Sequence, residues 1–200
     1  MRHKRLVPVA ALALILTGCG GAGSTSESAT TPPPTTAATT TTTTPTHEQT
    51  TSEPVPADNA DKSAPAGTDT AVTVTDVRIG AHDGFDRVVY EFGGTGTPGW
   101  TAGYVDQAVQ DGSGDLVEVG GTSILAVTIT GAAYPFDSGV EEYDGPDPLT
   151  DPTATVVDEV RFGATFEGMT QSWIGTTTDR PAFTVTTLSN PTRLVVDIAT

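Results

Sequence analysis

Short runs of alternating apolar and polar residues restrict, more than any other feature, how this 200-residue chain can fold. Between residues 72 and 200, Val88, Tyr90 and Phe92 occupy every second position, and Leu125–Ile129 and Leu194–Ile198 follow the same rule. A period of two places one face of a strand in a core and the other in solvent. Gly, Asp, Asn and Pro separate the runs, and no segment keeps a helical period. The pattern predicts an all-β domain of short strands with polar turns, a sandwich or a barrel.

An internal repeat narrows this prediction. The segment Val74-Thr-Asp-Val-Arg-Ile-Gly-Ala is echoed 83 residues later by Val157-Asp-Glu-Val-Arg-Phe-Gly-Ala. A weaker echo relates the Leu-x-Val-x-Ile runs that begin at Leu125 and Leu194. Such self-similarity indicates a duplicated unit. We therefore expect a β-sandwich of two packed antiparallel four-stranded sheets with pseudo-two-fold symmetry. The expected strands are 72–79, 86–92, 102–109, 122–130, 155–162, 169–174, 182–188 and 192–198.

The first residues have the organisation of an export signal. Residues 1–5 carry three positive charges, residues 6–16 are apolar, and the run ends in Leu16-Thr-Gly-Cys19. This resembles a bacterial lipobox, which implies removal of a signal peptide at 1–18 and attachment of a diacylglyceryl group and acyl chains such as palmitate to Cys19. Two or more acyl chains hold a protein stably on a membrane. Cys19 is also the only cysteine, so the chain forms no internal disulfide.

Residues 19–71 differ from both neighbouring segments. Thr, Ser, Pro, Ala and Gly dominate, and large apolar residues are almost missing. Such a composition does not bury enough apolar surface to offset the entropy of ordering, so we expect a disordered tether. Thr/Pro-rich stalks are often O-glycosylated, and the sequence leaves that open here.

The region 72–200 also resembles a known family. The Val-Arg-x-Gly opening, the stretch Gly84–Phe92 and the closing Asn190–Ile198 resemble the AMIN domain, and more closely the AMIN-like domain of lipoproteins from high-GC Gram-positive bacteria. In that resemblance Phe166-Glu-Gly and Ile174-Gly-Thr occupy the matching inner positions. The resemblance implies a sandwich of two symmetric sheets in the cell envelope, often associated with peptidoglycan. It implies no catalytic reaction, because the amidase domain to which AMIN domains are often fused is missing from this chain.

Charge and residue types exclude several functions. The net charge is −16, which opposes binding to nucleic acid and to anionic headgroups. His82 is the only histidine from residue 72 onward, so we expect no metal site, no cofactor and no enzymatic activity; a hydrolase centred on His82 is the remote alternative. The loop 137–151 holds six carboxylates and leaves Ca²⁺ binding open, although its spacing is not that of an EF-hand.

Two groups of side chains are candidates for ligand binding. Arginine binds carboxylates through two parallel hydrogen bonds, and peptidoglycan stem peptides carry carboxylates. The arginines in question are Arg78, Arg87, Arg161 and Arg193. The simpler interpretation is that they pair with nearby acids such as Asp86, Glu91 and Asp197. Aromatic rings stack on sugars, which makes Trp100, Tyr104 and Trp173 candidates, although large aromatics more often lie in a core.

These features together predict a lipid-anchored, extracytoplasmic protein of the cell envelope without enzymatic activity. Its membrane contact would be the lipid on Cys19, and its AMIN-like domain would bind peptidoglycan or a wall-associated partner. The alternative is a lipoprotein that binds or senses a small molecule, which requires an apolar cavity between the sheets.

Overall fold

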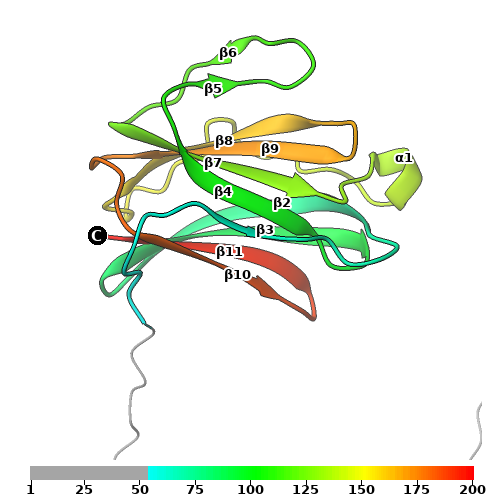
Figure 1. Ribbon diagram of the computed structural model, residues 1–200, viewed down its shortest axis with the longest axis horizontal. Coiled ribbons are helices and arrows are strands. Elements are labelled where there is room, and N and C mark those ends of the chain that lie inside the picture. The colour runs from blue at the N-terminus through cyan, green and yellow to red at the C-terminus, as the bar shows by residue number, and fades with distance from the viewer. Residues whose placement is uncertain (1–53) are drawn as a thin grey trace, which may run out of the picture. The chain divides into compact units, whose positions relative to one another are not determined.

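Alternating apolar residues form strands throughout the computed structural model, which describes residues 54–200 (Figure 1). The expected signal peptide, Cys19 and the tether up to residue 53 lie outside the described residues. In chain order the elements are β1 (Lys62–Ala64), β2 (Ala71–His82), β3 (Phe85–Thr95), β4 (Gly99–Val105), β5 (Ala108–Val109), β6 (Leu116–Val117), β7 (Ser123–Thr130), α1 (Pro135–Ser138), β8 (Val157–Phe166), β9 (Met169–Thr176), β10 (Phe183–Leu188) and β11 (Thr192–Ala199). The all-β prediction is confirmed. The expected strand 102–109 is in fact two elements, β4 and the short β5.

The strands form two antiparallel sheets that pack face to face, as Figure 1 shows. One sheet has five strands in the order β1-β4-β7-β9-β8, and the other has four in the order β10-β11-β3-β2. Each sheet takes two strands from each half of the repeat, so neither half folds into a sheet of its own. The hairpin β2–β3 pairs with β11, whereas β4 and β7 from the same half join β9 and β8 in the other sheet.

The predicted pseudo-two-fold symmetry is visible in the strand order and in the register. Replacing β4, β7, β9 and β8 by their repeat partners β10, β11, β3 and β2 converts one sheet order into the other. The register agrees: one row of Cα partners is Tyr104–Leu125–Ile174–Val160, and the equivalent row is Thr187–Leu194–Tyr90–Val77. The echoed leucines and valines therefore occupy matching positions in the two sheets.

Apolar side chains from both sheets fill the space between them. The central ones, including Val88, Leu125, Ile174 and Leu194, are fully buried, and each contributes about 1.5–3 kcal/mol of burial free energy. Tyr90 also lies in this core, where its hydroxyl group and that of Ser172 in the opposite sheet form a 2.9 Å hydrogen bond. Burial raises the pKa of Tyr90 far above its ordinary value. The two sheets therefore share one continuous core.

The folded part begins earlier than the composition suggests. The sequence places the end of the tether at residue 71, yet Pro56 is buried and β1 pairs with β4. The backbone N–H of Phe183 donates to the carbonyl of Asp58 at 2.9 Å, and the Lys62 ammonium group lies 4.2 Å from the centre of the Phe183 ring. Backbone pairing with distant strands, together with the few apolar contacts of Pro56 and Ala64, holds residues 56–70 in place. We call residues 54–70 the strap.

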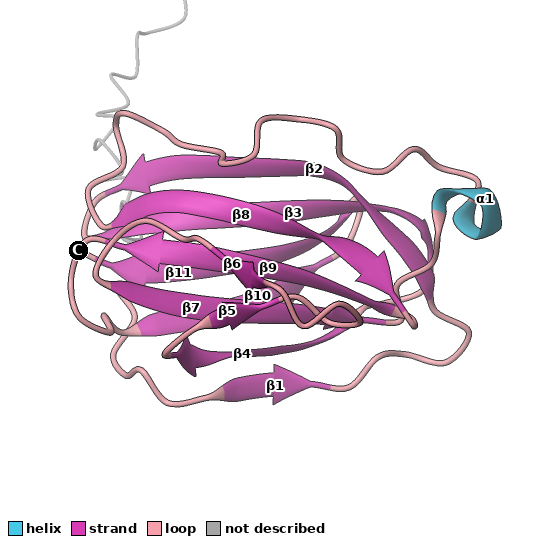
Figure 2. Ribbon diagram, turned by 90° about the horizontal axis from the view of Figure 1, so that it is seen from above, coloured by secondary structure: helices cyan, strands magenta, loops and turns pink. Residues whose placement is uncertain are grey.

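Two long connections carry elements that alternation did not predict. Residues 106–122, between β4 and β7, form the β5–β6 hairpin, which lies over the outer face of the five-stranded sheet (Figures 1 and 2). Residues 131–156, between β7 and β8, contain α1 at one end of the sandwich. In the part of the chain from 54 to 200, no helix has the length and apolar character needed to cross a bilayer.

Candidate functional site

The symmetry gives the sandwich two equivalent outer faces. They differ in the length of the connection between two equivalent strands, and this length determines which face is open. In one half, β4 and β7 are joined by residues 106–122, which form the β5–β6 hairpin. In the other half, β10 and β11 are joined by residues 189–191 alone. The outer face of the five-stranded sheet is therefore covered in part by this hairpin, whereas the outer face of the four-stranded sheet has no hairpin over it and is bordered by the start of the strap, at Pro54 and Val55.

The covered face contains two of the predicted candidates. Trp173 and Arg161 are Cα partners on β9 and β8, and Trp173 is only 3% exposed. The ring packs on Gly163, where an added Cβ would lie 3.0 Å from it. Gln171 fastens the hairpin: its Oε1 accepts from the N–H of Asp111 at 2.7 Å and its Nε2 donates to the carbonyl of Val109 at 3.2 Å. Trp173 is thus enclosed beneath the hairpin and offers no open stacking surface.

Arg161 is held by groups around it. Its Nε donates to the carbonyl of Glu118 at 3.0 Å, and it forms looser ion pairs with Glu159 at 3.4 Å and Asp147 at 3.5 Å. Together with Trp173 it lines a hollow of about 410 Å³. Because these contacts already occupy much of the guanidinium group, Arg161 acts here mainly as a link between β8 and the two long connections.

The open face gathers the other three candidate arginines, and we call it the arginine face. It consists of three rows of Cα partners across the four-stranded sheet: Asp76–Glu91–Arg193–Leu188, Arg78–Val89–Val195–Thr186 and Gly80–Arg87–Asp197–Thr184. Three arginines and three carboxylates thus surround the aliphatic residues Val89 and Val195. The face has no net charge, although residues 72–200 contain 19 acids and only five arginines.

Arg87 forms the best-ordered ion pair on this face. Its Nε and Nη2 donate to the two carboxylate oxygens of Asp197 at 2.6 and 2.9 Å. The side chains are 22% and 12% exposed, so the pair is largely shielded from water. It lies in a groove of about 420 Å³ between β10, β11 and the start of the strap, where Pro54 and Val55 form the opposite wall. For Arg87, the simpler interpretation that the arginines pair with nearby acids is confirmed.

Arg78 and Arg193 differ in how they are engaged. Arg78 pairs with Asp76 and, at 3.2 Å, with Glu91. Partial burial alone would lower the pKa of Arg78, but the hydrogen bonds that its guanidinium group donates to these two carboxylates raise it. Arg193 donates from Nε to the carbonyl of Pro191 at 3.3 Å, and among residues 54–200 no carboxylate forms an ion pair with it. The outer nitrogens of Arg193 are therefore the cationic donors on this face that are not already committed to an acid.

The remaining aromatic candidates lie elsewhere. Trp100 is in the core, 7% exposed, and its indole N–H donates to Thr187 across the two sheets at 3.1 Å. Tyr104 packs edge-on against Phe183 and donates to the carbonyl of Pro181 at 2.8 Å, and burial raises its pKa. The structure therefore brings Arg78, Arg87 and Arg193 together and separates them from Trp100, Tyr104 and Trp173.

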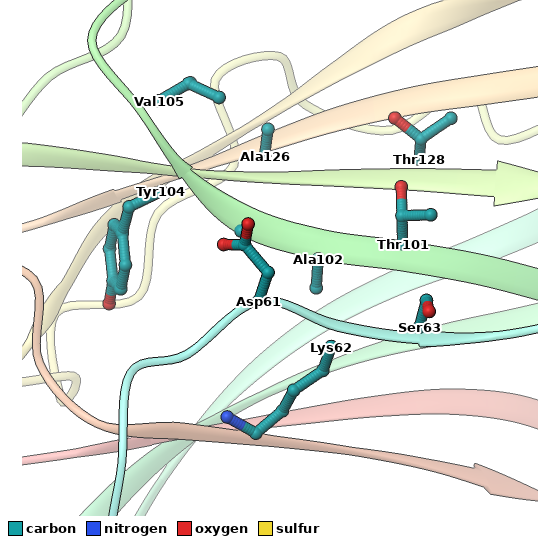
Figure 3. A pocket seen from close by; sticks show the side chains of 10 residues that line it. Asp61, Lys62, Ser63, Thr101, Ala102, Tyr104, Val105, Ala126 and Thr128 are labelled. Atoms are coloured by element: carbon teal, nitrogen blue, oxygen red, sulfur yellow. The ribbon is translucent and has the colours of Figure 1, made fainter.

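A second hollow lies along β1 and the outer face of β4 and β7 (Figure 3). It measures about 440 Å³, and small residues such as Ser63, Thr101 and Thr128 line it. Figure 3 shows Asp61 above β4 and the Lys62 ammonium group on the opposite side of β1. Lys62 forms an ion pair with Asp58, so its charge is directed away from the hollow. We place no function here.

Asp86 corrects one sequence interpretation. It does not pair with an arginine: it is fully buried, and its Oδ2 accepts the backbone N–H groups of Thr155, Val156 and Val157 at 2.7, 2.6 and 2.9 Å. Its Oδ1 has no partner among the described residues. The alternating pattern could have indicated this burial, because Asp86 occupies the same inward-facing set of alternate positions as Val88 and Tyr90.

The structure also shows where His82 and the acidic loop 137–151 lie. His82 is exposed and stacks on Phe85 at the β2–β3 turn. In the acidic loop, Thr165 donates to Glu142 at 2.8 Å, and Asp151 accepts from Thr153. Within residues 54–200 no three His, Asp or Glu side chains converge on a point that would hold a metal ion.

Two exposed aromatic residues were not among the candidates predicted from the sequence. Tyr134 and Phe136 flank the first residue of α1, and their rings stack with centroids 5.3 Å apart. Phe136 is 82% exposed. No periodic signal marks them, because they lie in a connection.

The strand order and the two related outer faces define the class of this protein, a duplicated antiparallel β-sandwich with one open face. A family model for the AMIN-like domain matches residues 72–200, and the chain belongs to that family. Membership in general suggests a non-enzymatic role associated with peptidoglycan. No curated protein and no solved structure matches the chain.

Proposed function

We propose that this chain is a lipid-anchored protein of the cell envelope that performs no catalysis and binds peptidoglycan, or a partner associated with it, through the arginine face. Membership of the AMIN-like family supports the class of ligand. The lipobox-like residues that end at Cys19 support attachment to the outer side of the cell membrane. The observation that carries the choice of face is Arg193, whose outer guanidinium nitrogens have no carboxylate partner within residues 54–200.

The chemistry of the face suits a carboxylate at the end of a peptide. A guanidinium group with two open N–H donors binds a carboxylate in a bidentate geometry. Leu188 is the Cα partner of Arg193 on β10 and is 39% exposed, so an aliphatic surface is available to the methyl groups of a short peptide. Arg87 is committed to Asp197 and keeps the strands in register, so we assign it a positioning role.

The distribution of charge restricts binding of an acidic ligand to this face. The 19 acids of residues 72–200 repel a polyanion as a whole, whereas the arginine face itself is neutral. A ligand with single, spaced carboxylates fits such a surface better than a continuous polyanion does.

The alternative of a small-molecule carrier has less support. It needs an apolar cavity between the sheets, and fully buried side chains such as Tyr90, Leu125 and Phe183 fill that space.

Sedimentation with insoluble peptidoglycan tests the proposal. The full chain should pellet with the polymer, and Arg193→Ala should reduce the bound fraction by several-fold. Arg180→Ala is the matched control, because Arg180 is half exposed and pairs with Asp106 away from this face. Wild-type protein that neither sediments nor captures an envelope protein would overturn the proposal, and so would equal binding by both variants.

Anchoring is tested separately. Cys19→Ala should move the chain from the membrane fraction to the soluble fraction and abolish incorporation of an alkyne-labelled fatty acid. Retention in the membrane with no label in the wild-type chain would contradict lipidation.

A further inference from the structure

Tyr134 and Phe136 form a surface that the proposed function does not use, and we call the pair the aromatic tip. The rings are nearly parallel, with 9° between their planes, and Phe136 is the most exposed large apolar side chain of residues 54–200. Single exposed apolar residues are ordinary on a protein surface, but a stacked pair presents a continuous aromatic area.

The aromatic tip stands on a fixed base. The hydroxyl groups of Thr73 and Ser138 are hydrogen-bonded at 2.7 Å, and Thr73 donates to the carbonyl of Ala133 at 2.7 Å. The backbone N–H of Ala133 also donates to the carbonyl of Val72 at 2.8 Å. Because Thr73 is 1% exposed, these bonds are shielded from water and hold the segment before and after the rings. A ligand would meet a preorganised surface and lose little entropy in ordering it.

A hollow of about 680 Å³ lies beside the aromatic tip and shares Pro135 with it. The hollow is lined by Thr75, Pro135, Val140, Glu141, Glu142 and Asp144. Glu142 accepts from Thr165, whereas Glu141 and Asp144 form no ion pair with any residue from 54 to 200. Residues 131–147 contain no Lys, Arg or His. The hollow therefore adds uncompensated negative charge to the edge of an aromatic surface.

Tyr143 lies beside this hollow in the chain, between Glu142 and Asp144. Burial raises the pKa of Tyr143, and the charges of Asp76, Asp147 and Asp144 add to the shift. Asp76 pairs with Arg78 and Asp147 with Arg161, so Asp144 is the acid among these three that belongs to the hollow.

We infer that the aromatic tip and the adjoining hollow form a docking surface for a basic segment of a partner protein, one that presents Arg or Lys beside an apolar side chain. Arginine and lysine bind over aromatic faces and pair with carboxylates, so one such side chain engages both halves of the surface. Charge complementarity argues against a membrane, a nucleic acid or a sugar as the ligand of this surface. An anionic membrane or nucleic acid is repelled, and a neutral sugar leaves the carboxylates without counter-charge.

This surface depends on side chains other than those of the arginine face, so the two proposals fail independently. The test measures binding of the full chain to a dye-labelled peptide of alternating Arg and Leu, by fluorescence anisotropy. A peptide with Gln in place of Arg is the comparison. We expect the Arg peptide to bind, to weaken as salt is raised, and to bind at least about tenfold more tightly than the Gln peptide.

Variants locate the site. Phe136→Ala and the double change Glu141→Gln with Asp144→Asn should each weaken binding by about tenfold. Phe166→Ala is the control for an exposed ring elsewhere, and Asp115→Asn is the control for an exposed acid; neither should change the affinity by more than about twofold. Phe136→Ala should leave peptidoglycan sedimentation unchanged.

Several results would overturn the inference. These are no binding of the Arg peptide, equal binding of the Gln peptide, or equal loss in the control variants. Binding of a chitin oligosaccharide or of phosphatidylglycerol vesicles that Phe136→Ala abolishes, with no binding of the Arg peptide, would assign the surface to a sugar or a membrane instead.

Discussion

Replacing Asp86 by alanine should be among the most damaging single changes in this domain. Its Oδ2 accepts three backbone N–H groups, from Thr155, Val156 and Val157, at 2.6–2.9 Å. A hydrogen bond to a charged group contributes about 1.5–3 kcal/mol, and three bonds that share one oxygen contribute less than three times that amount. Because the donors are left without a partner in a buried site, we expect a loss of about 3–5 kcal/mol in the free energy of unfolding.

The effect is large because of where Asp86 lies. It is the second residue of β3 in the four-stranded sheet, while its donors lead into β8 of the five-stranded sheet. For a domain of this size, the loss corresponds to a fall of roughly 10–15 °C in the melting temperature. Asp86→Asn keeps one accepting oxygen and should lose only about 1–2 kcal/mol.

Urea and thermal unfolding, followed by circular dichroism, measure these differences. Asp83→Ala, in the exposed turn just before, should stay within about 0.5 kcal/mol of the wild type. If Asp86→Ala also stays within about 1 kcal/mol, the three hydrogen bonds do not stabilise the junction between the sheets and the reasoning fails.

Three further outcomes follow from the same structure. Arg87→Ala breaks a shielded ion pair and should cost about 2 kcal/mol in urea unfolding, whereas Arg78→Ala, whose side chain is 48% exposed, should cost less than about 1 kcal/mol; equal losses would contradict the role of burial. Because burial raises the pKa of Tyr90, folding favours its neutral form, and this contribution to stability is present below about pH 10 and is lost as the pH rises above that value. Tyr90→Phe should therefore lose less stability than the wild type between about pH 9 and 11, although it is less stable at neutral pH; parallel pH profiles would count against this. Gly163→Ala places a methyl group 3.0 Å from the Trp173 ring and should destabilise the domain by about 1–3 kcal/mol, with a shift in tryptophan fluorescence as the second readout.

Alternation and the internal echo predicted most of the fold because both depend on local pattern. The strands around Val88 and Leu125 lie where the period of two placed them. The exchange of strands between the two sheets was not predictable, because pairing depends on partners far away in the chain. The same holds for β1, whose residues Lys62–Ala64 have no apolar pattern and owe their strand to β4.

The candidate site was predictable only in part. The alternating pattern already places Arg78, Arg87 and Arg193 on the outward-facing sides of their strands. The exchange of strands between the two sheets then brings the three onto one face. Sequence patterns did not separate Trp100, on the inner face of β4, from Trp173, on an outer face that a hairpin happens to cover. Both tryptophans are buried, for two different reasons.

The strap also determines how the domain would respond to mechanical load. Tension in the chain before Pro54 first meets the hydrogen bond at Asp58 and the three-residue pairing of β1 with β4, and only then reaches β2. Release of residues 54–70 adds roughly 60 Å of extended chain while the sandwich stays folded. Single-molecule pulling from the N-terminal side should record this extension as a separate, weaker event before the domain unfolds. The strap would then act as a short reserve of length between the folded domain and whatever holds the chain that precedes it.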